Sequence, residues 1–281
     1  MRYGVFLPNF GPFGDPHVLI DLARDAESYG WDGLFIWDHI LFQGDSPHDV
    51  VDPWVALAGI ATNTSTLRFG ALMTPLARRR PWKVARETAT LDRLSNGRLI
   101  VGAGLGFPPD AEFEFFGDPS DDRVRAQRLD EGLAILNGLW SGEPFSFSGE
   151  HYTLEEMQFL PTPVQKPRPP IWIAGWWPNK PPFRRAARWD GVYPERADWK
   201  IPTPDDLREI LAYVRQHRED GSDPKDVVLN GHTPHDPRRG ADRLEPYEAV
   251  GLTWWLERVD LEHLYSVEEA RGRIQSGPPK R

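Results

Sequence analysis

The sequence predicts a (β/α)8 barrel of the TIM-barrel type, formed by a single domain that spans residues 1–281. Short apolar runs alternate along the chain with amphipathic helical segments, and we count eight such strand–helix units. Parallel strands joined by helical crossovers either wind into an open sheet or close into a barrel. Eight units in a chain of this length favour the barrel, which typically occupies about 250 residues.

The first four units lie in the N-terminal half, with strands predicted at residues 2–8, 32–38, 67–74 and 98–104. An aspartate followed by proline starts the first two helices, at Asp15–Pro16 and Asp52–Pro53. Gly30 and Asn96–Gly97 are typical helix ends and predict where the first and third helices stop. The fourth helix is long, with its apolar face at Leu129, Leu133, Leu136 and Trp140.

The second half continues the alternation, with strands predicted at residues 170–175, 191–194, 227–232 and 252–257. A short helix is expected from Phe183 to Trp189. The next two helices begin at Thr203–Pro204 and Asp236–Pro237. Ser266 and Glu269 form a capping box, which predicts the start of the last helix. Residues 142–169 break the rhythm and are expected to form an insertion after helix four, as a hairpin near the barrel mouth.

The amino-acid composition excludes several classes of function. The chain has no Cys, which excludes disulfides, thiolate metal sites and thiol nucleophiles. Its net charge is −9 and it has no long basic run, so it is a poor candidate for binding nucleic acid or a membrane surface. No apolar run approaches the ~18 residues of a membrane helix. We therefore expect a cytoplasmic protein that acts on a small molecule.

In a barrel of this kind the active site lies at the carboxyl ends of the strands. The predicted ends include two histidines, few carboxylates and several aromatic residues: Trp37, Phe107, Trp176 and Trp177. Such a set favours a pocket for a flat, apolar ring system over a bare metal cage. Gly102, Gly104 and Gly106 follow a strand, but Phe107 and two prolines come next, which excludes the dinucleotide-binding Rossmann motif.

Four segments carry a family resemblance: LPNFG, FIWDH, LMTPLARRRPWKVARETATLDRLSNGRLIVGAGLG and IAG…FRRAARWDGVY. They resemble the bacterial luciferase-like superfamily of flavin-dependent oxidoreductases, over residues 1 to about 257. The resemblance implies an eight-stranded barrel that transfers hydride or oxygen between a reduced cofactor, coenzyme F420 or FMN, and a small organic substrate. The chain lacks the long insertions of the FMN monooxygenases that it otherwise resembles, which favours F420.

The resemblance also implies site residues. His39 would be the catalytic proton donor or acceptor, with Asp38 orienting it or bonding to loop amides. A non-proline cis peptide is expected between Ala71 and Leu72. Residues that would hold the cofactor are Asn9, Ala71, Leu72, Thr74, Gly104, Gly106, Phe107, Gly175, Trp176 and Trp177, with Arg184 and Arg185 at its phosphate. Arg78, Arg79 and Arg80 could meet the anionic arm of F420 or an acidic substrate. Sugar-phosphate dehydrogenases of the family have a catalytic Glu where Phe107 stands, so their scheme does not transfer.

Two other functions stay open. A metal-dependent barrel hydrolase would use His39, Asp45, His48 and Asp49, but their spacing suits a turn-rich loop and no metal is expected. A non-catalytic flavin-binding barrel would have the same fold, although His39 and the pocket residues are present. A homodimer is left open as the assembly.

Overall fold

The computed structural model describes residues 1–42, 47–259 and 266–279. Within them, one sheet contains β1 (Arg2–Leu7), β2 (Gly33–Ile36), β3 (Arg68–Ala71), β4 (Thr74–Pro75), β5 (Val101–Gly104), β8 (Ile171–Trp177), β9 (Gly191–Arg196), β10 (Asp226–Gly231) and β11 (Trp254–Arg258). Their order is β3-β2-β1-β11-β10-β9-β8-β5-β4, and all pairs are parallel.

The sheet closes into a barrel because β3 also meets the chain just before β5, through a parallel bridge between Phe69 and Leu99. The strands β3 and β4 follow each other in the chain and together take one strand position in the barrel wall. The sheet therefore fills the eight strand positions of the predicted barrel. At the closure, a Cβ on Gly70 would lie 2.0 Å from the Ile100 carbonyl oxygen. Only glycine allows this approach of the two backbones.

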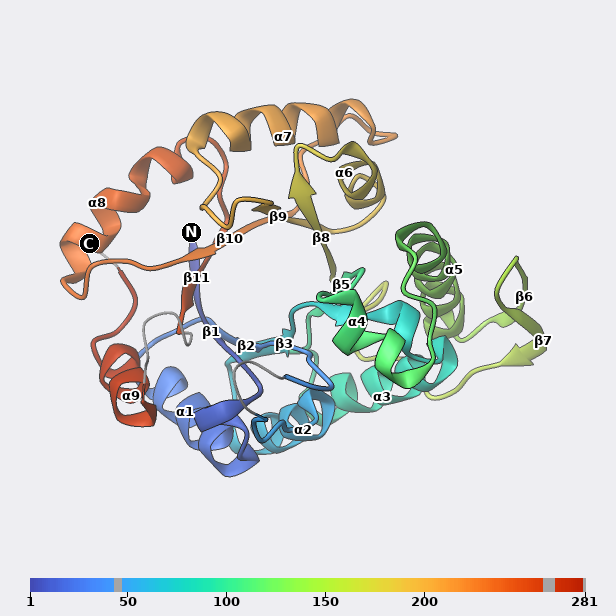
Figure 1. The fold of residues 1–281 in the computed structure, drawn as a ribbon, viewed down its shortest axis with the longest axis horizontal. Helices are drawn as coiled ribbons and strands as arrows, with labels where there is room; N and C mark the ends of the chain where they lie inside the picture. Colours follow the sequence, from blue (N-terminus) through green and yellow to red (C-terminus); the bar gives the residue numbers. More distant parts are fainter. Residues whose placement is uncertain (43–46, 260–265, 280–281) are drawn as a thin grey trace.

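Apart from the short α4, which lies at the barrel mouth, the helices lie outside the ring of strands (Figure 1). They are α1 (Pro16–Ser28), α2 (Pro53–Asn63), α3 (Pro81–Leu94), α4 (Pro109–Glu112), α5 (Asp122–Ser141), α6 (Lys180–Ala186), α7 (Pro204–Gln216), α8 (Pro237–Glu248) and α9 (Val267–Gln275). The predicted caps are confirmed: Asp15 and Asp52 accept from backbone N–H groups of α1 and α2, and capping boxes open α7 and α9. None of the described helices is long and apolar enough to cross a membrane.

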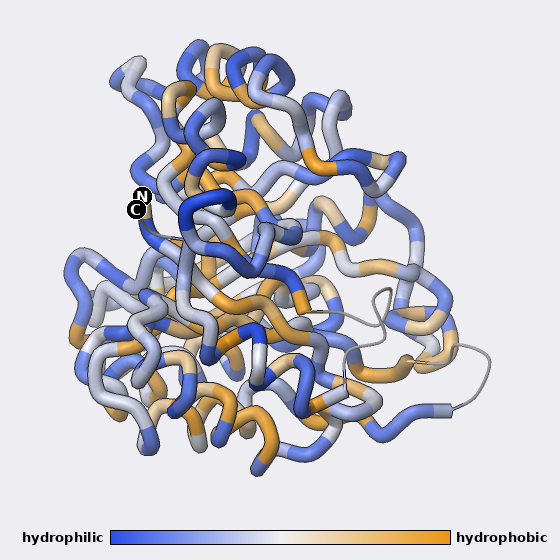
Figure 2. Tube along the Cα trace, turned by 90° about the vertical axis from the view of Figure 1, so that its left-hand side faces the viewer, coloured by the Kyte–Doolittle hydropathy of each residue, from blue (hydrophilic) through white to orange (hydrophobic). Residues whose placement is uncertain are grey.

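Apolar side chains fill two layers. The outer layer lies between strands and helices, and the inner layer fills the barrel interior. Figure 2 shows hydrophobic segments running through the middle of the molecule, with hydrophilic segments over much of the outer helices. The inner layer consists of Phe6, Phe35, Leu72, Ile100, Trp172, Tyr193, Val228, Trp254 and Leu256. Successive side chains of a strand point alternately to the outer and the inner layer. The position of a residue in its strand therefore decides whether its side chain faces the helices or the barrel interior.

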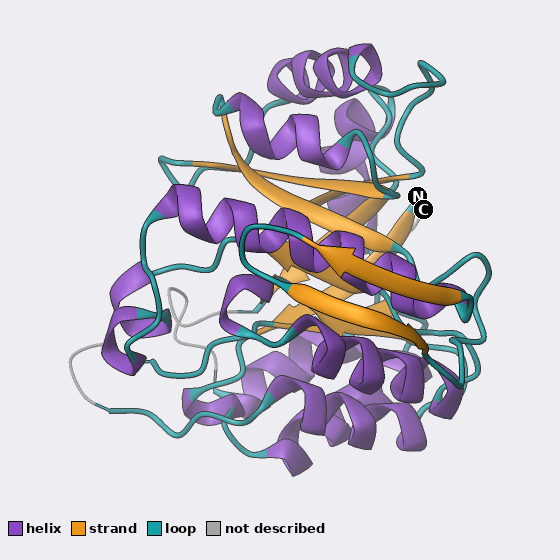
Figure 3. Cartoon of the chain, turned by 90° about the vertical axis from the view of Figure 1, so that its right-hand side faces the viewer, coloured by secondary structure: helices purple, strands orange, loops and turns teal. Residues whose placement is uncertain are grey.

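The predicted insertion contains a hairpin, formed by β6 (Pro144–Ser148) and β7 (Thr153–Gln158) in antiparallel pairing. It lies along the outer side of α5, where Glu131 accepts backbone N–H groups from residues 150–152 (Figure 3). The Tyr152 ring also meets Trp82 at the start of α3. The hairpin therefore covers the outer helices. The expectation that it lies near the barrel mouth is wrong.

Candidate active site

His39 lies just beyond β2, at the carboxyl edge of the barrel. Its ring sits edge-on among Phe10, Trp37 and Phe42, with centroids 5.6–5.7 Å away. Its Nδ1 is 2.8 Å from Oε1 of Glu112, and its side chain is 16% exposed. Among the described residues Nε2 has no hydrogen-bond partner, so this is the ring nitrogen left to exchange a proton.

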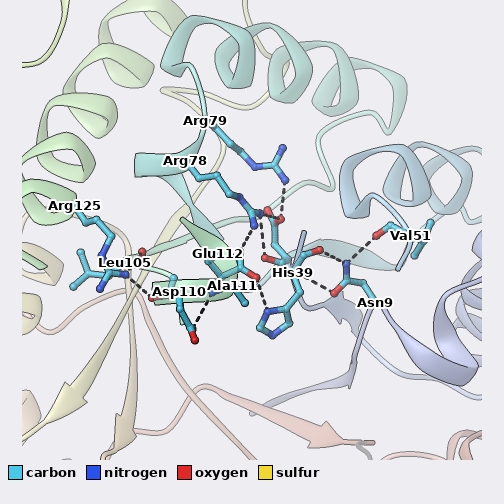
Figure 4. Close-up of polar contacts among 12 residues, drawn as sticks. Asn9, His39, Val51, Arg78, Arg79, Leu105, Asp110, Ala111, Glu112 and Arg125 are labelled. Carbon is cyan, nitrogen blue, oxygen red and sulfur yellow. Dashed lines mark hydrogen bonds and ion pairs between the residues drawn. The ribbon is translucent and has the colours of Figure 1, made fainter. Parts of the chain in front are cut away.

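Glu112 ends the short helix α4 and is fully buried. Its Oε1 faces His39, and its Oε2 accepts a hydrogen bond from Nη1 of Arg78 (Figure 4). An ionised carboxylate only accepts hydrogen bonds, so this contact places the proton of neutral His39 on Nδ1 and its lone pair on Nε2. Glu112 therefore sets both the tautomer and the ring orientation of His39.

Arg78 joins this pair to Asp38. Its Nη2 donates to Asp38 Oδ1 over 2.6 Å, and Nη2 of Arg79 donates to the same oxygen over 2.7 Å. Two carboxylates and two guanidinium groups thus compensate each other in a mostly buried row, as buried charges require. The expected contact of Asp38 with His39 is wrong, because Asp38 points to the arginines and Glu112 orients the histidine.

This pairing also occupies two of the arginines that were expected to meet an anionic arm. Arg78 and Arg79 are bonded to Asp38 and Glu112, and Arg80 alone of the three is exposed. A cavity of about 300 Å³ lies beside the arginines and His39, lined further by Ile40 and residues 50–53.

Asn9 holds the backbone of the His39 loop. Its Nδ2 donates to the carbonyl oxygens of His39 and Val51, each over 2.8 Å, and its Oδ1 accepts from the His39 N–H. The Asn9 side chain is fully buried, and its bonds go to backbone groups. Asn9 is therefore a positioning residue for the loop that carries His39.

The floor of the mouth is made of partly buried residues that rest on the inner layer: Trp37, Met73 and Ala174. Gly104 lies between the last two, since a Cβ there would be 3.2 Å from Met73 Cβ and 3.6 Å from Ala174 Cβ. The Trp37 Nε1–H is buried without a partner among the described residues. An apolar floor, a glycine without a side chain and a free donor fit a flat ring with a polar edge.

Arg125 fixes the next loop. Its guanidinium donates to the carbonyl oxygens of Leu105 and Gly106, over 3.0 and 2.8 Å. Gly106 has φ +84°, and a Cβ on it would lie 2.8 Å from Pro75. This loop presents Phe107 at the rim, where its ring meets Trp176 and Trp199 at centroid distances of 5.2 and 5.6 Å.

Strand three departs from the expectation in two ways. The non-proline cis bond joins Leu72 and Met73, one bond later than predicted. The side chains of Leu72 and Met73 both face inward, while Ala71 packs in the outer layer and Thr74 pairs in register with outer-layer Ala103. The side chains of Ala71 and Thr74 therefore face the helices, and Leu72 alone of these three predicted residues lies in the barrel interior.

Strand β8 shows the same alternation. Trp176 faces inward, but Trp177 is buried against Phe183 of α6, and a Cβ on Gly175 would strike Pro182 of that helix. The Trp177 side chain and the Cα atom of Gly175 therefore face helix α6. The expectation that these two residues line the cofactor site is wrong.

The predicted phosphate contacts are also wrong for one arginine. Both lie in the last turn of α6, whereas the expectation put them in its first turns. Arg185 is buried and holds Asp130 of α5 through two 2.8 Å hydrogen bonds. Arg184 is exposed on the same turn. Arg185 therefore joins two outer helices.

No group of three or more metal-ligating side chains occurs in the part of the chain that the structure describes. Asp45, one of the ligands weighed from the sequence, lies outside the described residues. His48 packs against Phe42, with ring centroids 5.7 Å apart.

The sequence reasoning missed Glu112, Arg78 as its partner, and Arg125. The sugar-phosphate dehydrogenases of the family have their acid at the position of Phe107, directly after the strand, while this chain has Glu112 at the end of the next helical turn. The run Pro108–Glu112 is a signal that could have revealed it, because prolines at a helix start followed by acids predict one short turn over the mouth.

Comparison with known proteins agrees with the fold. The family model described as luciferase-like monooxygenase matches residues 1–233. An F420-dependent hydroxymycolic acid dehydrogenase of Mycobacterium tuberculosis is 33% identical over 159 residues, which are 56% of this chain and 43% of the relative. An F420-dependent glucose-6-phosphate dehydrogenase of Nakamurella multipartita is 32% identical over 151 residues, covering 53% and 44%. The matched regions thus span less than half the length of these two relatives.

Among solved structures, the coenzyme F420 dependent tetrahydromethanopterin reductase from Methanopyrus kandleri superposes with a TM-score of 0.77. The match covers 98% of this chain and 96% of that one at 16% identity. At this identity the likeness concerns the fold, and it confirms the predicted barrel.

The Arg185–Asp130 contact predicts a pH-dependent stability. Burial alone would raise the pKa of Asp130, but the bonds and charges of Arg185 and Arg188 hold it below its ordinary value. Arg185→Met should therefore lower the free energy of unfolding by about 1–2 kcal/mol at pH 7, since Asp130 is partly exposed. A carboxylate with a lowered pKa stabilises above its unfolded pKa of about 4 and loses this as pH falls, so the difference should shrink towards pH 3.

Urea denaturation between pH 3 and 7 measures this difference, with Arg184→Met as the matched control on the exposed side of the same turn. A loss of F420 affinity at unchanged stability would instead restore Arg185 to the cofactor site.

Proposed function

Because the chain belongs to the luciferase-like monooxygenase family, we propose that it is an F420-dependent oxidoreductase that exchanges hydride with a small, largely apolar organic substrate. The observation that carries the proposal is the buried His39–Glu112–Arg78 row at the mouth of the barrel. It presents one ring nitrogen beside an apolar floor suited to a flat cofactor. The curated relatives reported above are both named F420-dependent, which favours F420 over FMN.

Several residues would hold the cofactor. The floor of Trp37, Met73, Gly104 and Ala174 would lie under its ring, and the Trp37 Nε1–H would bond to a polar edge. Leu72 supports this floor from within the barrel. When bound, F420 supplies a site that accepts or gives up a hydride.

His39 is proposed to hold and move the proton that accompanies hydride exchange. Its Nε2 is free of described partners, while Nδ1 is fixed by Glu112. A carboxylate behind the ring stabilises the imidazolium that forms when Nε2 takes up a proton. The rings of Phe10, Trp37 and Phe42 pack around His39, limit its contact with water and keep its orientation.

The choice of cofactor is tested by titrating the purified protein with F420 and with FMN while recording tryptophan fluorescence. We expect a dissociation constant for F420 at least about tenfold lower than for FMN, a difference of ~1.4 kcal/mol. Tighter binding of FMN would make the protein an FMN enzyme. Failure to bind either would leave a barrel of this family without flavin chemistry.

The histidine row is tested by a double-mutant cycle. His39→Ala should lower turnover by ~10²–10⁴ while F420 affinity stays within a few-fold, because it removes a proton carrier. Glu112→Gln should lower turnover less. The double variant should stay within about threefold of His39→Ala alone, since residues that act as one unit are not additive.

Glu114→Gln is the matched control, because Glu114 is an exposed acid two residues away that bonds to Ser120. Additive losses in the double variant would show that Glu112 acts independently of His39. Unchanged turnover in His39→Ala would remove the histidine from the chemistry.

A further inference from the structure

A second set of polar side chains lines the barrel mouth opposite His39. In the order of the sheet, β9 lies four wall positions from β2 in either direction, so their carboxyl ends face each other across the mouth. Glu195 stands near the end of β9. Its side chain shares the inner face with Tyr193, since residues two apart on a strand point the same way and Tyr193 belongs to the inner layer.

Glu195 is held in its wall by contacts from the two neighbouring strands, β8 and β10. It pairs in register with Trp176 of β8 and accepts hydrogen bonds from the Trp176 indole and the Asn230 amide of β10. The Asn230 amide also donates to the Tyr193 hydroxyl. Among the residues that the structure describes, Arg258 of β11 is the charged group whose field acts on Glu195. Glu195 is nonetheless partly exposed, so it can touch a bound molecule.

Above this carboxyl group stands an aromatic rim formed by Phe107, Trp176 and Trp199. The three rings meet one another at 5.2–5.6 Å, and Phe107 and Trp199 are about half exposed, at 47% and 57%. Trp176 belongs both to the rim and to the contacts of Glu195. A molecule entering between this rim and His39 therefore meets apolar ring faces first and one carboxyl group below them.

Burial raises the pKa of Glu195, and the bonds from Trp176 and Asn230 and the charge of Arg258 oppose this only in part. Burial also raises the pKa of neighbouring Tyr193, with the charge of Glu195 adding to the effect. Within this wall a second negative charge beside that of Glu195 is thus disfavoured. A carboxylate in such surroundings accepts a hydrogen bond from a neutral hydroxyl group, whereas a second anion beside it is repelled.

We propose that Glu195 determines substrate specificity: its carboxylate accepts a hydrogen bond from a neutral hydroxyl group of an apolar substrate, and it excludes substrates that present a carboxylate or phosphate there. This deepens the proposed function and rests on it. On one side of the mouth, His39 holds or moves the proton that accompanies hydride exchange. On the other side, Glu195 binds a polar group of the same substrate molecule. The rim of Phe107, Trp176 and Trp199 covers the apolar body between them.

Isothermal titration calorimetry with cinnamyl alcohol and cinnamate tests this, because the two probes have the same apolar body and differ in charge. The F420-loaded wild type should bind the alcohol about tenfold or more tightly than cinnamate. Glu195→Gln has nearly the same shape without the charge, and should bring the two affinities within about threefold, mainly by improving cinnamate binding. Glu195→Asp, which keeps the charge, should retain the preference.

Asp198→Asn is the matched control, because Asp198 is an exposed carboxylate three residues away that is bonded to Arg196. It should leave the preference of the wild type unchanged. A wild type that binds cinnamate as well as the alcohol, or that does not bind the alcohol, would overturn the proposal. So would an unchanged preference in Glu195→Gln.

The F420 titration of the same variants separates this outcome from failure of the proposed function. Glu195→Gln should bind F420 within about threefold of the wild type. A loss of F420 affinity without a change of preference would overturn the proposal by making Glu195 a cofactor contact. If the wild type itself does not bind F420, the proposed function fails, and the two probes still report on Glu195 in the protein without cofactor.

Discussion

The mouth of the barrel depends on one buried carboxylate, that of Glu112. It is the acceptor shared by His39 and Arg78, and through Arg78 it is coupled to Asp38 and Arg79. Five side chains, which follow three neighbouring strand positions of the barrel wall, are therefore held by one chain of charge-assisted bonds. Since removing one member leaves a buried charge uncompensated, the row fixes the geometry of the histidine as well as joining the loops.

The barrel makes this arrangement possible by separating its two layers of side chains. Residues that face the helices hold the fold, as Arg185 and Trp177 do, and residues that face inward form the mouth. The inner layer is filled with aromatic residues, so the mouth has an apolar floor. The polar groups stand on its rim, with the His39 row on one side and Glu195 on the other. In the arrangement that we propose, a substrate between them contacts both groups.

Much of the fold could be predicted from sequence, because strand and helix periods, proline-led caps and the capping box at Ser266 are local signals. The position of His39 at a strand end could be predicted in the same way. The side of the sheet on which Trp177, Thr74 and Gly175 lie could not be predicted. It depends on the register of the strands and on the two successive inward side chains of Leu72 and Met73. The partner of His39 was missed because Glu112 lies 73 positions away in the chain, and only the closed barrel brings the two together.

The central claim is that Glu112 fixes the proton of His39 on Nδ1 and leaves Nε2 for exchange. The most direct test is the ¹⁵N NMR spectrum of the histidine ring in labelled protein, assigned by comparison with His39→Ala. At a pH where His39 is neutral, we expect Nδ1 to carry the proton and Nε2 to give the signal of an unprotonated nitrogen, with this preference lost in Glu112→Gln. A neutral His39 protonated on Nε2 in the wild type would contradict the account.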